Sequence, residues 1–227
     1  PVLQNYLEAL CGAGFVMDGT PALVADNTDA KVPLDGGDPE RNRRLRYVNY
    51  ADTRTSFGVR IIWALAPIPA AGGLVLVPAS HRRVTTPPAD FLSGADDQEM
   101  TEEPVLEAGD LLICAATILH GVRGRPGRLI ETEYISARVM PIAGYPEVEA
   151  PEWTQELTPE QQAVVGIRTT GRGGKVLADG ERTWETTAVE EPASMVFNLD
   201  KDSIPDPREL WFWDVRGYLV LRGVMDE

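Results

Sequence analysis

Side chains suited to metal or acid–base chemistry are few in this sequence. Its 227 residues contain two histidines, His81 and His120. The cysteines Cys11 and Cys114 lie far apart in the chain and lack the short spacing of a zinc or redox motif. A metal or proton-transfer site that uses imidazole must therefore be built on His81, His120 or both.

Three segments have the order and spacing of a known site. Residues 63–82 read as a strand, a Gly-Gly turn and then Pro-Ala-Ser-His-Arg, and residues 107–121 read as an Ala-Gly-Asp turn, an apolar strand and Leu-His-Gly. Arg128 follows His120 after a short loop. Together these segments resemble the phytanoyl-CoA dioxygenase family of non-haem iron, 2-oxoglutarate-dependent dioxygenases, with Ala79 where glycine is usual.

The resemblance implies Fe(II) and 2-oxoglutarate as cofactors and a small organic molecule as the substrate that is hydroxylated. It implies that His120 is a metal ligand and that His81 is structural. It also implies that Arg128 holds the far carboxylate of 2-oxoglutarate, which a guanidinium pairs with through two parallel hydrogen bonds. The strand that Arg128 opens is expected to carry Ile130, Thr132 and Tyr134 on one face.

The chain departs from the family before the strand at residues 58–65. Family members carry a ligand histidine there, whereas this chain reads Leu-Asp-Gly-Gly-Asp over residues 34–38, with Asp35 at the ligand position. Asp35 and His120 could form a weaker, oxygen-rich iron site, or the Asp and Gly residues could simply form a turn. We predict weak iron binding, and that Asp35→His raises both iron binding and 2-oxoglutarate turnover. The sequence assigns no further catalytic residue.

The apolar segments predict a mainly β fold. Strands are expected at residues 58–65, 74–77, 111–115 and 128–138, separated by Gly and Pro turns. This order favours a double-stranded β-helix, a jelly-roll or cupin-like barrel of two facing sheets, with peripheral helices such as one over residues 1–10. The loops at residues 18–56 and 83–104 are expected to select the substrate.

The sequence also suggests how the chain is divided. Residues 1–165 are interpreted as a dioxygenase-like jelly-roll domain whose N-terminal part is missing, with a short helix near residues 158–165. Residues 166–208 are interpreted as a loop-rich linker. Residues 209–227 resemble the start of a second copy of the same domain, a helix leading into Gly-Tyr-Leu-Val-Leu-Arg-Gly. We expect the strand of this last segment to dock on the first domain, because exposing its aromatic residues would be costly.

The composition of the chain argues against some classes of binding partner. The formal net charge of −14 opposes binding to nucleic acid and to anionic membrane surfaces. No apolar run is long enough to span a bilayer, and the two cysteines do not suggest a disulfide framework, so a cytoplasmic location is expected. The sequence says nothing about the oligomeric state.

Two other functions remain open from the sequence. The first is a catalytically inactive family member that binds a small carboxylate or a partner protein. The second is a cupin-like sugar-binding or isomerase barrel, which would normally show several clustered histidines that this chain lacks.

Overall fold

The computed structural model describes residues 2–18, 21–23, 32–50, 53–70, 73–95, 99–123, 129–136, 139, 155–157, 161, 164 and 205–225. Its helices and strands follow in chain order: α1 (Val2–Cys11), β1 (Val16–Met17), β2 (Ala22–Leu23), α2 (Pro39–Arg44), β3 (Tyr47–Tyr50), β4 (Thr53–Ser56), β5 (Gly58–Ala64), β6 (Leu74–Val77), η1 (Ser80–Arg82), α3 (Ala89–Leu92), β7 (Leu111–Ala115), β8 (Leu119–Val122), β9 (Leu129–Ile135), α5 (Pro207–Arg216) and β10 (Tyr218–Leu221).

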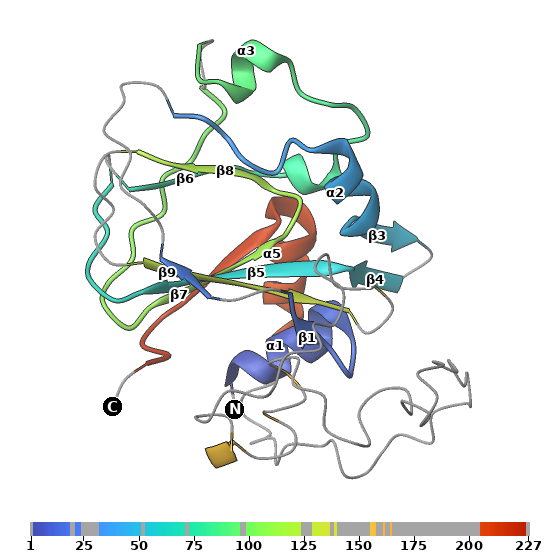
Figure 1. The fold of residues 1–227 in the computed structure, drawn as a ribbon, viewed down its shortest axis with the longest axis vertical. Helices are drawn as coiled ribbons and strands as arrows, with labels where there is room; N and C mark the ends of the chain where they lie inside the picture. The colour runs from blue at the N-terminus through green and yellow to red at the C-terminus, as the bar shows by residue number, and fades with distance from the viewer. Residues whose placement is uncertain are drawn as a thin grey trace.

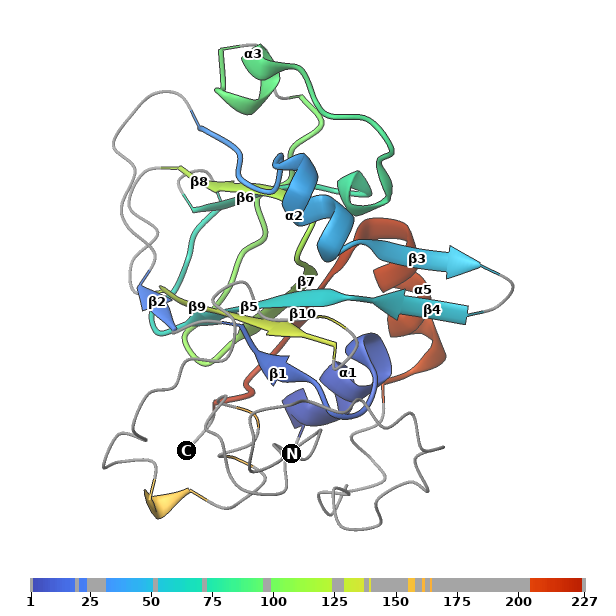
Figure 2. The same ribbon diagram turned by 45° about the vertical axis from the view of Figure 1, so that its right-hand side comes forward.

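The described strands form antiparallel sheets. The large sheet has the order β1-β9-β5-β7-β10, with β2 also paired to β9. A second sheet, β6-β8, lies opposite it, and the hairpin β3-β4 extends to one side (Figures 1 and 2). The fold is therefore mainly β with few helices, as predicted from the sequence.

Strand β5 lies at the centre of the packing and is buried on both faces. Ile62 and Ala64 belong to the apolar core that the large sheet shares with β6 and with Leu106. Val59 and Ile61 point the other way, into a second core with helix α1. Because successive strand residues face opposite sides, burial on both faces requires the nearly continuous apolar run seen here. The one charged residue in that run is Arg60.

The C-terminal segment packs on the same body as the rest of the described chain. Helix α5 begins with a capping box between Asp206 and Glu209 and ends at Gly217, whose φ is 83°. The following strand, β10, pairs with β7 and places Tyr218 opposite Cys114. The predicted docking of this segment is thus confirmed. Glycine is favoured at position 217, where helix α5 ends, because a left-handed φ is costly for other residues.

Most of the strand boundaries agree with the sequence, but the loop at residues 18–56 contains more structure than expected. Helix α2 begins after Asp38, whose side chain accepts a hydrogen bond from the Glu40 N–H, with proline at the start of the helix. No helix among the described residues is long and apolar enough to cross a membrane. The predicted helix at residues 158–165 lies largely outside the described residues, as does the linker, from residue 166 to 204.

Candidate functional site

Asp35 and His120 come together across the gap between an irregular segment and strand β8. Their backbones form an isolated antiparallel bridge, with the Asp35 N–H donating to the His120 carbonyl at 2.7 Å. Gly36 then turns the chain with a φ of +88°, and a Cβ there would lie 2.4 Å from the carbonyl oxygen of Ile118. The bridge places Oδ2 of Asp35 3.9 Å from Nε2 of His120. Asp35 and His120, which the sequence suggested as a pair, therefore lie next to each other in the structure.

The ring of His120 is held in one orientation. Its Nδ1 lies 3.0 Å from the carbonyl oxygen of Ile118, which can only accept, and also 3.0 Å from Nη1 of Arg60, which can only donate. Burial and the nearby Arg60 lower the pKa of His120 to about 3, so the imidazole is neutral at ordinary pH.

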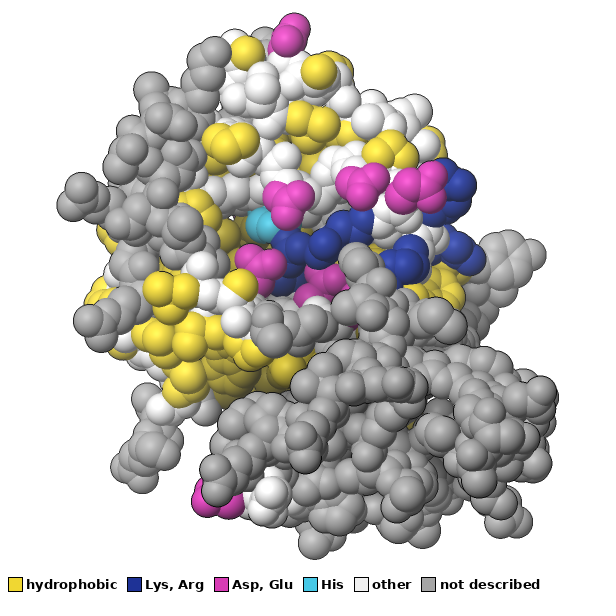
Figure 3. Space-filling model, in the orientation of Figure 1, with side chains coloured by type: hydrophobic (Ala, Val, Ile, Leu, Met, Phe, Trp, Pro, Cys, Tyr) yellow, Lys and Arg dark blue, Asp and Glu magenta, His cyan; other side chains and the backbone are white. Residues whose placement is uncertain are grey.

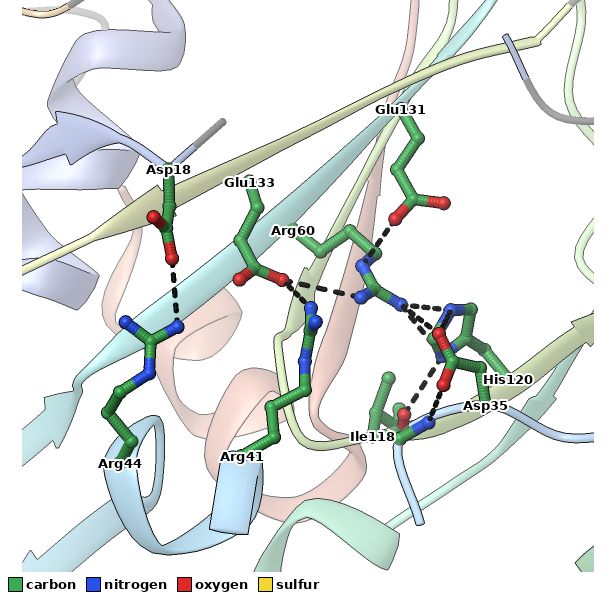
Figure 4. A network of polar contacts seen from close by, with 10 residues as sticks. Asp18, Asp35, Arg41, Arg44, Arg60, Ile118, His120, Glu131 and Glu133 are labelled. Atoms are coloured by element: carbon green, nitrogen blue, oxygen red, sulfur yellow. Dashed lines mark hydrogen bonds and ion pairs between the residues drawn. The ribbon is translucent and has the colours of Figure 1, made fainter. Parts of the chain in front are cut away.

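Arg60 lies against the ring of His120. Its side chain is 2% exposed, and one guanidinium nitrogen, Nη1, contacts Nε2 of His120 (Figure 4). The same nitrogen lies 3.0 Å from Nδ1 of His120, so it contacts both nitrogens of the ring. The same nitrogen lies 4.0 Å from Oδ2 of Asp35. Arg60 was not predicted from the sequence as a site residue. A lone arginine in the apolar run of β5 could have indicated it, because a buried charge needs a partner.

Two glutamates on β9 complete the environment of Arg60. Nε of Arg60 lies 2.8 Å from Oε1 of Glu131, and Nη2 lies 3.3 Å from Oε2 of Glu133. Arg41, on helix α2, also contacts Glu133. Burial raises the pKa of Glu133 although both arginines act to lower it. The result is a network of alternating charges between the sheets, drawn in Figure 4.

Asp35 is the part of this cluster that reaches solvent. Its side chain is 71% exposed, whereas that of His120 is 7% exposed. Partial burial alone would raise the pKa of Asp35, but the Gly36 N–H and the neighbouring His120 and Arg60 lower it overall. The space-filling view shows a histidine side chain within a depression, with basic and acidic side chains around it (Figure 3). Asp35 is therefore ionised and available to a molecule that enters.

The described residues do not fit an iron ion as they are arranged. The usual site presents two imidazoles and one carboxylate to the metal. Here Asp35 and His120 provide one of each, and the Arg60 cation lies against the imidazole. No group of three or more His, Cys, Asp or Glu side chains in the described part of the chain could hold a metal ion.

The other predicted positions have different outcomes. Arg128 lies outside the described residues. On the described part of β9, the face that carries Tyr134 points away from the site. The Tyr134 ring packs edge-on against Phe15, with ring centroids 5.9 Å apart. Residues on the opposite face of the strand, such as Glu131, meet Arg60. His81 is buried against the Tyr47 ring, which agrees with a structural role.

Comparison with known proteins gives structural neighbours only. No protein-family model matches the sequence, and a comparison with curated proteins finds no match. The structure of HygX from Streptomyces hygroscopicus with nickel, 2-oxoglutarate and hygromycin B bound is 15% identical, with a TM-score of 0.50 over 69% of this chain and 68% of that chain. ThoJ, a non-haem monooxygenase in complex with nickel, is 20% identical, with a TM-score of 0.42 over 62% and 52% of the two chains. EctD from S. alaskensis is 14% identical, with a TM-score of 0.40 over 66% and 58%.

The extent of these matches limits what they establish. The chain spans 61% of HygX in the complex with nickel and 2-oxoglutarate alone. The neighbours are iron- and 2-oxoglutarate-dependent non-haem oxygenases, and Fe(II) and 2-oxoglutarate are the cofactors of that enzyme class. At these identities the likeness concerns architecture. The chain shares the fold of HygX.

Proposed function

We propose that this chain is a small-molecule-binding domain built on the oxygenase fold, and that it works without iron at the Asp35–His120 site. The observation that carries this proposal is the contact between Arg60 and Nε2 of His120. The guanidinium contacts both ring nitrogens of His120 and so places a positive charge beside the imidazole, which opposes the binding of a metal cation there. Because arginine does not lose its proton in proteins, this cation is permanent.

The exposure of Asp35 supports a binding role. A carboxylate at the mouth of a buried polar cluster can accept hydrogen bonds from the amino or hydroxyl groups of a small polar molecule. A carboxylate ligand finds less support within this cluster, since Arg60 and Arg41 already face Glu131 and Glu133. The proposed ligand is therefore a small molecule that donates to Asp35.

The test is succinate formation. The protein is loaded with Fe(II) without oxygen, given 2-oxoglutarate and then exposed to oxygen, with His120→Ala as the matched control. We expect equal background levels of succinate from both proteins, because the Arg60 cation against the His120 ring opposes iron binding there. Succinate from the parent protein that disappears in His120→Ala would overturn the proposal.

A second function is favoured by the preset ring of His120 and its closeness to Asp35. It is an iron(II)/2-oxoglutarate dioxygenase of the phytanoyl-CoA type that hydroxylates a small organic substrate, with Arg128 as the residue that binds 2-oxoglutarate. It requires Arg60 to leave His120 and a further ligand to join. The same succinate assay decides between the two functions.

For either function, we infer that the two facing sheets are the halves of a jelly-roll. The antiparallel pairing of β6 with β8 and the larger sheet opposite support this inference. We also propose that residues 1–165 form the core domain, that residues 166–208 are a linker, and that residues 209–227 resemble a domain start whose strand completes the edge beside β7. The expected location in the cytoplasm remains a proposal.

A further inference from the structure

We propose that Arg83 is a positioning residue for the ligand site, because its guanidinium fixes the turn at Asp35 against the chain that leads into His120. This inference rests on the proposed function, in which Asp35 receives the ligand. It adds the residue that sets where the Asp35 carboxylate lies. Arg83 directly follows helix η1, which ends at Arg82.

The guanidinium of Arg83 joins three segments of the chain. Its Nη1 donates to the carbonyl oxygen of Ser80 at 2.8 Å and to the carbonyl oxygen of Thr117, and its Nη2 donates to the carbonyl oxygen of Gly36. Ser80 belongs to η1, Thr117 lies two residues before strand β8, and Gly36 lies in the segment that is bridged to β8. Because a guanidinium is planar and its N–H groups form a rigid fork, these segments are held at set distances.

The contact with Gly36 bears directly on the Asp35 carboxylate. The N–H of Gly36 donates to Oδ1 of Asp35 at 2.8 Å, while the carbonyl of the same glycine receives Arg83. The φ of Gly36 is +88°, and glycine has the greatest backbone freedom of any residue. A turn built on glycine therefore needs an outside contact to hold the carboxylate in one place, and Arg83 provides it.

Helix η1 also holds the chain on the His120 side. Oγ of Ser80 accepts a hydrogen bond at 2.8 Å from the N–H of Leu119, the residue before His120. The N–H of Arg83 donates at 3.2 Å to the carbonyl oxygen of Ser80, which closes the η1 turn. Helix η1 and the start of β8 are thus joined, and Arg83 ties the Asp35 turn to both.

The backbone bridge between Asp35 and His120 should therefore depend on Arg83. Its two N–H···O distances are 2.7 and 3.2 Å. A second isolated bridge, between Ile68 and Leu106, has distances of 2.7 and 3.1 Å and contains none of the three residues whose carbonyls receive Arg83. The second bridge is an internal reference, because it reports a general loss of stability without a change at the site.

The experiment measures amide hydrogen exchange by NMR in the parent protein, Arg83→Met and Arg83→Lys. In Arg83→Met the amides of Asp35 and His120 should exchange at least about tenfold faster relative to the amides of the reference bridge, as expected when a hydrogen bond from a charged donor is lost. Arg83→Lys keeps the charge but not the planar fork, so it should restore the exchange rates only in part.

A matched control is Arg44→Met. Arg44 is a partly buried arginine on helix α2 that pairs with Asp18 at 2.8 Å, away from His120 (Figure 4). Its loss should leave the relative exchange rates of the two bridges unchanged. This control separates the position of Arg83 from the general effect of removing a partly buried arginine.

Two results would overturn the inference. One is a folded Arg83→Met protein in which the amides of both bridges are accelerated by the same factor, or in which neither is accelerated. The other is a failure of both Arg83 variants to fold, since the side chain would then be required for the fold and not for the site. The exchange rates need neither ligand nor iron, so they are independent of the succinate assay that tests the proposed function.

Discussion

Arg60 and Glu133 are register partners on neighbouring strands, β5 and β9, so their side chains emerge on the same face of the large sheet. Glu131 lies opposite Ile62 in the same register, two residues further along, and faces the same side. The ion pairs of Arg60 are therefore set by the strand pairing itself. A small loop movement would not release the guanidinium from both glutamates.

The first prediction concerns the substitution that the sequence suggested. We expect Asp35→His alone to give no gain in iron binding or succinate, because the Arg60 cation would still lie against the His120 ring. Asp35→His combined with Arg60→Met should raise both, since the cation beside the two imidazoles is then removed. The measurement is succinate after anaerobic iron loading, with Asp35→His plus Arg44→Met as the control. A gain from Asp35→His alone would show that Arg60 moves aside readily.

The site contains features that could be predicted from the sequence and others that could not. The motif around His120 placed a histidine at the end of an interior strand, and Asp35 was expected beside it. The structure places their side chains 3.9 Å apart, whereas their role as metal ligands stays a prediction. Arg60 was missed because strand alternation alone does not show which partner a buried arginine meets. Its partners come from the register of β5 with β9, which depends on the whole sheet.

The second prediction concerns the docking of helix α5. Trp213 is 1% exposed in the core beneath the large sheet, whereas Trp211 on the same helix is 57% exposed. Trp213→Ala should lower the free energy of unfolding by about 3–5 kcal/mol through lost burial and an unfilled cavity. Trp211→Ala should change it by about 0.5 kcal/mol or less. Urea denaturation of the two variants provides the comparison, and equal losses would mean that α5 is not packed as described.

The third prediction concerns Ala79, which stands where the resembling family has glycine. Its φ is 63°, the one positive value outside glycine among the described residues. A side chain in the left-handed region costs about 1–2 kcal/mol, and glycine avoids this strain while adding freedom to the unfolded chain. Ala79→Gly should therefore stabilise the protein by about 0.5–1 kcal/mol. A lower melting temperature would contradict this reading of the turn.

The fourth prediction separates backbone strain from steric contact at two glycines. Gly12 and Gly217 have φ values of +84° and +83°. A Cβ on Gly12 would have no atom within 4 Å, but one on Gly217 would lie 2.3 Å from Nδ1 of His81. Gly12→Ala should cost about 1 kcal/mol, and Gly217→Ala about 1–3 kcal/mol more because His81 must shift. Similar melting temperatures for the two variants would show that the His81 ring yields easily.

The last prediction concerns acid stability and follows from the buried ring of His81. Burial, followed by the charge of Arg82, lowers the pKa of His81 from 6.5 to about 4, and Asp214 offsets this only in part. Above pH 6.5 the residue is neutral in both states and adds no pH dependence. As the pH falls from 6.5 to about 4, the unfolded chain takes up a proton that the folded protein does not, so stability falls.

At pH 5 this difference corresponds to about 2 kcal/mol for His81 alone. Urea denaturation at pH 7.5 and pH 5.0 should therefore show a larger loss of stability for the parent protein than for His81→Gln, which does not titrate. His120, whose pKa is also lowered, acts in the same direction in both proteins and cancels in the comparison. An equal loss in the parent and in His81→Gln would mean that the His81 ring becomes protonated without leaving its place between Tyr47 and Gly217.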